Sequence, residues 1–285
     1  MINTDFLNQL KRFSLIINKR VTSSFSGSKK STALGRGLIV NDFRQYVPGD
    51  DFRTIDWKIY ARTDDFYVKR FEEERSLTTH VLIDTSKSMD YGTINRTKFD
   101  YAAMLGLGFA YLTSRENEKF QLSTFNDENI DTFRAKRGVS QVMGFLYHLN
   151  RVKCKNNVNF QKIMSQYKKS IKSKSMIIII SDFLLDIDEI KNSLYLFKQH
   201  ELKVIQVLDR SEIDFNLKGN IILEDSETGK KVETYVSEKR REEYRERLYD
   251  HMLELEEEVM RAGGKFYMFS TEEPMFDAFY KILNG

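Results

Sequence analysis

The run from Met176 to Ile180 (MIIII) restricts the fold of this chain more than any other segment. A strand with no polar position must bury both of its faces. Buried strands of this kind are typical of parallel sheets that are covered by helices on both sides. The sequence around this run should therefore supply further strands and the helices that cover them.

Apolar residues along most of the chain follow the strand period and the helix period in alternation. We predict strands at 79–83, 120–125, 130–134, 176–180, 202–208 and 265–270, and helices at 98–114, 139–149, 160–171, 187–200, 237–262 and 274–283. Small residues in the 98–114 helix would let it approach a sheet closely. Strands that alternate with helices predict an α/β fold, with a mostly parallel (Rossmann-like) sheet and helices on both faces.

The region before residue 77 has a different pattern. Residues 3–18 have the spacing of an amphipathic helix, and the Ser/Gly-rich stretch 21–37 is typical of a flexible loop. We therefore predict an N-terminal helix and loop over 1–34, a small β-rich module over 35–76, and the α/β domain over 77–285. A predicted hairpin within 212–236 is expected to join the β-rich module.

Composition excludes several classes of function. The 45 basic and 42 acidic residues nearly cancel, and runs such as 239–241 are short and followed by acids, so we expect no nucleic-acid binding. Cys154 is the single cysteine and the four histidines are scattered, which excludes an intrachain disulfide and a zinc site. One cysteine is typical of a reducing compartment, so we expect a cytoplasmic protein.

No segment of the sequence predicts a membrane anchor. The first residues have neither the charge nor the apolar core of a signal peptide. The longest near-apolar run, 101–112, is shorter than the roughly twenty residues that a membrane-spanning helix needs. We therefore expect no transmembrane segment.

Two acidic loops follow predicted buried strands. Asp84, Ser86 and Ser88 occupy alternate positions after the 79–83 strand, and Asp182 follows the 176–180 strand. The carboxyl ends of parallel strands are where such sheets bind ligands. Carboxylate and hydroxyl oxygens suit Mg²⁺ or Mn²⁺, so these four residues are the candidate metal ligands. Simple capping of the next helix by Asp84 and Ser86 is the alternative.

The Asp84-Thr85-Ser86-Lys87-Ser88 loop resembles the metal-ion-dependent adhesion site of von Willebrand factor A domains. A second resemblance rests on Tyr46 to Lys58 (YVPGDDFRTIDWK), Ala61-Arg62 and Phe71 to Arg75 (FEEER). These motifs resemble the bacterial domain-of-unknown-function family fifty-eight, and the likeness runs from about Gly35 to Ser211. The resemblance implies a von Willebrand factor A-like fold. It also implies a MoxR-type AAA+ ATPase as partner, because family members are commonly encoded beside one.

One position departs from the adhesion-site pattern. Such sites usually add a threonine from a third loop, and the best alignment places Val158 there, which has no oxygen to donate. Asn157 or Asn159 could take its place if the loop shifts by one residue. Without such a shift, the missing oxygen predicts a degenerate site with weak metal binding.

The 48–75 segment carries its own cluster of charged residues. We expect Asp50, Asp51, Arg53, Asp56 and Arg62 to form structural ion pairs around a turn, with Trp57 as a buried anchor. A catalytic cluster is the alternative. Nothing in the segment supplies a nucleophile with an adjacent base, so the structural interpretation is favoured.

The leading functional prediction is a protein-binding adaptor without enzyme activity. The resemblance implies a role with a MoxR-type ATPase in the assembly or maturation of other proteins, and other von Willebrand factor A-domain proteins are further possible partners. The alternative is a metal-dependent hydrolase or phosphotransferase that uses Asp84 and Asp182. It lacks the second aspartate expected two positions after Asp84, where Ser86 stands, and the chain has no phosphate-binding loop.

Overall fold

The structure is a computed structural model. It describes Phe6, Gln9 and residues 32–35, 39–74, 78–116, 118–136, 138, 140–155, 159–217, 219–224 and 231–284. Its contacts divide the chain into two compact units, Met1–Val21 with Leu77–Gly285 and Thr22–Ser76. Most of the predicted N-terminal helix lies outside the described residues, although Phe6 and Gln9 are helical.

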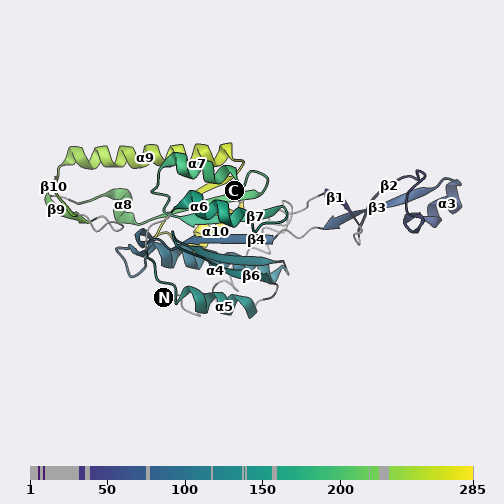
Figure 1. The fold of residues 1–285 in the computed structure, drawn as a ribbon, viewed down its shortest axis with the longest axis horizontal. Helices are drawn as coiled ribbons and strands as arrows, with labels where there is room; N and C mark the ends of the chain where they lie inside the picture. The colour runs from purple at the N-terminus through teal and green to yellow at the C-terminus, as the bar shows by residue number, and fades with distance from the viewer. Residues whose placement is uncertain are drawn as a thin grey trace. The chain divides into compact units, whose positions relative to one another are not determined.

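The larger unit is built on one six-stranded sheet (Figure 1). Its strands are β4 (Thr78–Asp84), β5 (Phe120–Phe125), β6 (Ile130–Lys136), β7 (Ser175–Ser181), β8 (Glu201–Leu208) and β11 (Lys265–Ser270), in the order β11-β8-β7-β4-β5-β6. All neighbours are parallel except β5 and β6, which form an antiparallel pair at one edge. This topology confirms the predicted mostly parallel α/β class.

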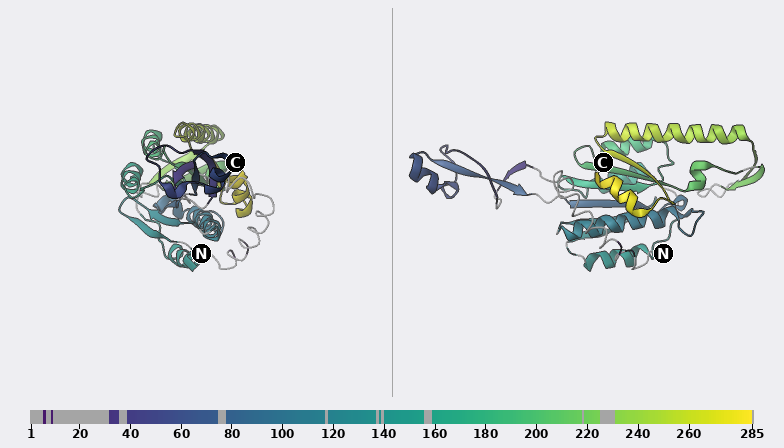
Figure 2. Two further views of the ribbon diagram at one scale, coloured as in Figure 1. Left: turned by 90° about the vertical axis from the view of Figure 1, so that its right-hand side faces the viewer. Right: turned by 180° about the vertical axis from the view of Figure 1, so that it is seen from behind.

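Helices cover both faces of this sheet, as predicted (Figure 2). One face carries α4 (Lys98–Arg115), α5 (Ser140–Leu149) and α10 (Met275–Asn284), and the other carries α6 (Phe160–Lys168), α7 (Ile187–Tyr195) and α9 (Glu238–Arg261). Strand β7 is buried at every position. The MIIII run is therefore the central buried strand that the sequence indicates.

Side chains of β4 alternate between the two helical layers. Leu82 belongs to the core beneath α6 and α7. Ile83 faces Gly106 of α4, where an added Cβ would lie 2.6 Å from the Ile83 Cδ1 atom. The predicted close approach of α4 to the sheet is thus confirmed. Within the described residues, no helix is both long and apolar enough to cross a membrane.

The hairpin of β9 (Gly219–Glu224) and β10 (Lys231–Val236) belongs to the larger unit. From the sequence, the hairpin is expected to join the 35–76 module, and the structure differs on this point. The hairpin directly follows the short helix α8 (Arg210–Asp214) and leads into α9, so both of its neighbours in the chain are parts of the sheet domain.

The smaller unit contains a three-stranded antiparallel sheet. Its elements are β1 (Thr32–Gly35), β2 (Ile39–Gln45), the 3-10 turn η1 (Phe52–Thr54), α3 (Trp57–Thr63) and β3 (Tyr67–Glu74), with strand order β1-β3-β2. The strand at 32–35 falls within the stretch that the sequence analysis assigns to a flexible loop. Helix α3 was not predicted, and it begins where the Asp56 carboxylate accepts hydrogen bonds from the amides of Lys58 and Ile59.

The acids of the 48–75 segment have structural partners, as expected, but partly different ones. Asp50 forms an ion pair with Arg44 at 2.6 Å, and Asp56 forms one with Lys69 at 3.2 Å. The partners are thus strand residues rather than Arg53 and Arg62. Each pair ties the turn or the start of α3 to the small sheet, which explains these acids without a catalytic role.

The prediction that Trp57 is a buried anchor is wrong, because its side chain is 58% exposed. Trp57 is the first residue of α3, and no residue of this helix is buried. It contacts other rings edge-on, with centroids 6.1 Å from Tyr60 and 6.4 Å from Phe66. We call Tyr46, Phe52, Trp57, Tyr60 and Phe66 the aromatic patch. Its member Phe52 is 67% exposed.

Replacing Trp57 should therefore change stability little. We expect Trp57→Ala to lower the free energy of unfolding by less than about 1 kcal/mol, because little buried area is lost. Ile55→Ala is the control, since Ile55 is buried and a buried Ile→Ala change costs about 2–5 kcal/mol. Chemical denaturation measures both values. A loss for Trp57→Ala as large as that for Ile55→Ala would contradict the exposed placement.

The close contact between α4 and α10 gives a second test. A Cβ added at Gly108 would lie 1.9 Å from the Cζ atom of the buried Phe279 ring. Gly108→Ala should therefore lower the free energy of unfolding by about 1–3 kcal/mol through overpacking. Gly144→Ala in α5 is the matched control, because no atom lies within 4 Å of its added Cβ. The control should gain up to about 1 kcal/mol from helix propensity. Equal effects at both positions would argue against the α4–α10 packing.

Candidate binding site at the carboxyl edge of the sheet

The structure brings the two predicted acidic loops together. Strand β4 ends at Asp84, and its parallel neighbour β7 ends at Ser181, directly before Asp182. The Ser181 hydroxyl donates a 2.6 Å hydrogen bond to Oδ2 of Asp84. Asp84 and Asp182 are 1% and 3% exposed. The acids therefore share one buried cluster rather than two separate surface positions.

Two hydroxyl groups of the loop after β4 lie close together. The Ser86 amide donates to Oδ1 of Asp84 at 2.7 Å, and the Ser86 and Ser88 hydroxyl oxygens lie 3.0 Å apart. Ser86 begins the 3-10 turn η2 (Lys87–Asp90), but its side chain makes no capping bond there. Helix capping by Ser86, the alternative explanation of this motif, is therefore not supported.

Sequence reasoning missed the cation of this cluster. Lys98, the first residue of α4, is fully buried. Its Nζ atom donates to Oδ2 of Asp182 at 2.9 Å and to Oε1 of Glu212 at 2.8 Å. Burial alone would lower the pKa of Lys98, but the charges of Asp182 and Glu212 raise it above its ordinary value. The ammonium therefore stays charged inside the protein.

A third strand-end acid, Asp209 after β8, was also missed. Its carboxylate accepts hydrogen bonds from Thr93, Ser211 and Thr271, with the Thr93 and Ser211 hydroxyls both 2.7 Å away. Glu212 completes a capping box, because its Oε2 accepts from the Asp209 amide at 2.8 Å. The strand-end rule that identified Asp84 and Asp182 would also have found Asp209.

The loop after β7 is held in an uncommon backbone conformation. Phe183 is fully buried and has a φ of 50°, in the left-handed region that non-glycine residues rarely adopt. Gln206 Nε2 donates to the Asp182 carbonyl at 2.8 Å, and His251 Nε2 lies 2.7 Å from the Phe183 carbonyl. Groups from β8 and α9 thus fix the loop that positions Asp182.

The Asp84 carboxyl group is poorly placed to act as a nucleophile. Burial, together with the nearby charge of Asp182, raises its pKa to about 7, although hydrogen bonds from Ser181 and Ser86 act in the opposite direction. Both of its oxygens accept hydrogen bonds, and the group is almost inaccessible. The arrangement therefore gives no support to the alternative of a phosphotransferase that uses Asp84.

The surroundings of the four predicted ligands are unfavourable for a divalent metal ion. The 3.0 Å between the Ser86 and Ser88 hydroxyls would suit neighbouring ligands of an octahedral ion. However, Asp182 already contacts the Lys98 ammonium, and both Asp84 oxygens are hydrogen-bonded within the protein. A dication here would lie beside a buried positive charge. In the part of the chain that the structure describes, no group of three or more His, Cys, Asp or Glu residues could hold a metal ion.

The third loop of the predicted site is only partly described. Val158 and Asn157 lie outside the described residues. Asn159 is the N-cap of α6, and its Oδ1 accepts a 3.0 Å hydrogen bond from the Lys162 amide. The Asn159 side chain is therefore engaged in starting a helix, and it is not available to replace a threonine ligand.

Comparison with known proteins identifies the family. The family model described as "Protein of unknown function DUF58" matches residues 42–254, so this chain belongs to that family. The uncharacterised protein Mb1516 of Mycobacterium bovis is 22% identical over 266 residues, which cover 92% of this chain and 84% of Mb1516. The uncharacterised protein YeaD of Bacillus subtilis is 31% identical over 78 residues, which cover 27% of this chain and 20% of YeaD.

Solved structures with a similar fold include von Willebrand factor A domains. BatB from Bacteroides thetaiotaomicron matches with a TM-score of 0.44 and 12% identity, over 73% of this chain and 100% of that chain. The VWA domain of SpRpn10 matches with a TM-score of 0.43 and 10% identity, over 72% of this chain and 94% of that chain. At these scores, the fold class rests on the sheet topology itself.

The hydrogen bonds of Asp209 predict an acid-sensitive contribution to stability. Burial alone would raise the pKa of Asp209, but its bonds from Thr93 and Ser211 lower it from 3.8 to about 2. A carboxyl group with a lowered folded-state pKa stabilises the fold when ionised. Its contribution is present above about pH 4 and is lost as the pH falls toward 2.

Thermal melts of wild type and Asp209→Asn between pH 7 and pH 2 test this. The difference in Tm between the two proteins should be largest above about pH 4 and should shrink toward pH 2. Asp188→Asn, which removes an exposed carboxylate, is the control and should track wild type. A Tm difference for Asp209→Asn that is constant over the whole pH range would show that Asp209 does not act through its charge.

Proposed function

We propose that this protein is a protein-binding adaptor that docks its partner at the carboxyl edge of the six-stranded sheet. Its partner class is a MoxR-type AAA+ ATPase, and its role is in the assembly or maturation of other proteins. The family membership and the absence of a phosphate-binding loop from the sequence support this proposal. An ATP-driven task would then need a partner that binds the nucleotide.

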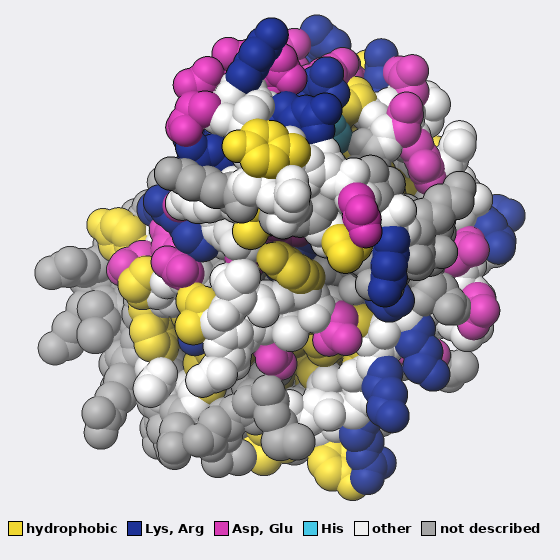
Figure 3. All heavy atoms as spheres, turned by 90° about the vertical axis from the view of Figure 1, so that its left-hand side faces the viewer, with side chains coloured by type: hydrophobic (Ala, Val, Ile, Leu, Met, Phe, Trp, Pro, Cys, Tyr) yellow, Lys and Arg dark blue, Asp and Glu magenta, His cyan; other side chains and the backbone are white. Residues whose placement is uncertain are grey.

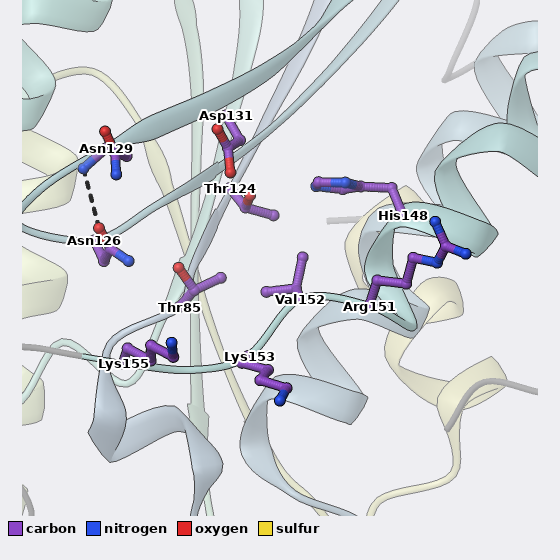
Figure 4. A pocket seen from close by; sticks show the side chains of 10 residues that line it. All are labelled: Thr85, Thr124, Asn126, Asn129, Asp131, His148, Arg151, Val152, Lys153 and Lys155. Atoms are coloured by element: carbon purple, nitrogen blue, oxygen red, sulfur yellow. Dashed lines mark hydrogen bonds between the residues drawn. The ribbon is translucent and has the colours of Figure 1, made fainter.

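The observation that carries the proposal is a hollow of about 380 Å³ beside the Asp84 loop (Figure 4). We call it the edge hollow. It is lined by Thr85, Thr124, Asn126, Asn129, Asp131, His148, Arg151, Val152, Lys153 and Lys155. These residues come from the loop after β4, from β5 and β6 with their turn, and from α5 and the segment after it. The hollow therefore joins several loops at the edge where parallel sheets bind ligands.

The lining of the edge hollow combines rigid contacts with exposed positive charge. The Lys155 amide donates a 2.9 Å hydrogen bond to the Thr85 carbonyl, which ties the segment after α5 to the Asp84 loop. Arg151, Lys153 and Lys155 are exposed, and Asp131 is the acidic residue of the lining. Figure 3 views the sheet from this edge and shows Lys and Arg side chains along one side of the face.

This charge balance favours an acidic partner segment. Among the described residues, neither Lys153 nor Lys155 lies within ion-pair distance of a carboxylate, and Arg151 stacks on the Tyr147 ring 3.9 Å from its centroid. A carboxylate from a partner would gain charge-assisted hydrogen bonds there without first breaking an internal ion pair. Asp84 and Asp182, being buried, would position the loops rather than contact the partner.

Charge reversal at the edge hollow tests the proposal. Binding of a purified MoxR-type ATPase from the same organism would be measured by pull-down and by interferometry. We expect the double variant Lys153→Glu/Lys155→Glu to weaken binding at least about tenfold, mainly in the association rate, with the wild-type affinity falling as salt is raised. The control is Lys169→Glu/Lys172→Glu. It makes the same charge change on exposed residues just before β7, at the opposite edge of the six-stranded sheet.

Full binding by the Lys153→Glu/Lys155→Glu variant would contradict docking at the edge hollow. The aromatic patch of the smaller unit is the second candidate surface, because exposed aromatic residues are enriched among the residues that dominate interfaces. Phe52→Ala/Trp57→Ala should then be the variant that loses the ATPase. No binding of the ATPase by wild type would contradict the proposed partner class.

A further inference from the structure

The buried Lys98 ammonium is a positive charge shared by two acids at the carboxyl edge of the sheet. It is 0% exposed, and its two contacts at 2.8 and 2.9 Å join acids from two different segments. Asp182 follows β7, whereas Glu212 lies in α8, after β8. A long side chain with a fixed charge is almost never fully buried unless such partners are present.

The rest of the cluster fixes the ammonium in place. The Thr97 hydroxyl caps α4 by accepting from the Asp100 amide at 3.0 Å, and the Lys98 amide donates to the Tyr91 carbonyl at 2.8 Å. Glu212 is held from the other side, because its second oxygen accepts from the Asp209 amide. The charge network thus runs from the loop after β7, through α4, to the loop after β8.

We infer that Lys98 is a built-in cation that orders the carboxyl edge of this sheet in place of a divalent metal ion. An ion at an adhesion site would draw strand-end acids from separate loops to one positive centre. The Lys98 ammonium draws Asp182 and Glu212 together in the same way, and it is covalently attached. The edge is then in its folded arrangement at any concentration of divalent ion. This inference concerns the isolated protein and does not depend on the proposed ATPase partner.

The inference predicts that removing the ammonium creates a metal site. Lys98→Met keeps an unbranched apolar stem, removes the terminal ammonium, and leaves Asp84, Asp182 and Glu212 as an acidic cluster with hydroxyl groups beside it. Oxygen ligands of this kind suit Mg²⁺ and Mn²⁺. The variant should therefore lose stability in metal-free buffer and regain part of it when either ion is added.

The experiment compares Tm in a chelating buffer with Tm at millimolar Mg²⁺ or Mn²⁺, and counts bound Mn²⁺ by electron paramagnetic resonance. Wild type should bind no Mn²⁺ at micromolar concentration, and its Tm should change by less than about 1 °C. The Tm of Lys98→Met should rise by about 3 °C or more with metal. Lys191→Met is the matched control, because Lys191 lies 3.9 Å from the buried Glu258 carboxylate away from this edge. It should show no metal response.

Stoichiometric Mn²⁺ binding by wild type would overturn the inference, whatever the variants do. A folded Lys98→Met protein that does not respond to either ion would overturn it as well, because the ammonium would then not stand in a cation position. If Lys98→Met does not fold, the double variant Lys98→Met/Glu212→Gln takes its place, because it removes one charge of each sign and should fold. It keeps Asp84, Asp182, Ser86 and Ser88, so its Tm should still rise with Mg²⁺ or Mn²⁺. No metal response from this folded variant would overturn the inference.

Discussion

The ion pairs of Lys98 with Asp182 and Glu212 are the interactions on which the carboxyl edge of this protein depends. Two carboxylates and an ammonium are removed from water there, which is costly unless the geometry is good and each charge is paired. The contacts of 2.8 and 2.9 Å meet that condition. The loops after β7 and β8 and the start of α4 are consequently held as one unit, and the Asp84 loop joins it through the Ser181 hydroxyl.

The site resembles a metal-dependent adhesion site in sequence, but it contains the positive charge of the buried Lys98 side chain. The Asp84, Ser86 and Ser88 loop keeps the expected spacing, whereas Asp182 is committed to Lys98. The protein-binding role that we propose uses the accessible rim of this edge instead. The exposed lysines of the edge hollow and the half-buried Ser88 are available to a partner, whereas Asp84 and Asp182 are not.

The fold was largely predictable because it depends on the pattern of apolar residues. The apolar MIIII run predicts a central strand, and the alternation of strands with helices predicts that Asp84 and Asp182 lie at one edge of the sheet. The site was less predictable because its chemistry depends on burial. Lys98 begins a helix, a position where lysines are usually exposed, and only the packing of α4 reveals that it lies under the edge. Trp57 shows the converse, since a large aromatic residue in a turn-rich segment predicts burial, whereas its side chain is exposed.

An experimental structure of crystals grown with MnCl₂ would test the central claim most directly, because Mn²⁺ can be located by its anomalous scattering. The account predicts no anomalous peak between Asp84 and Asp182, with Lys98 Nζ within hydrogen-bond distance of both Asp182 and Glu212. An anomalous peak coordinated by Asp84, Ser86 and Ser88, with the Lys98 side chain turned away from Asp182, would contradict it.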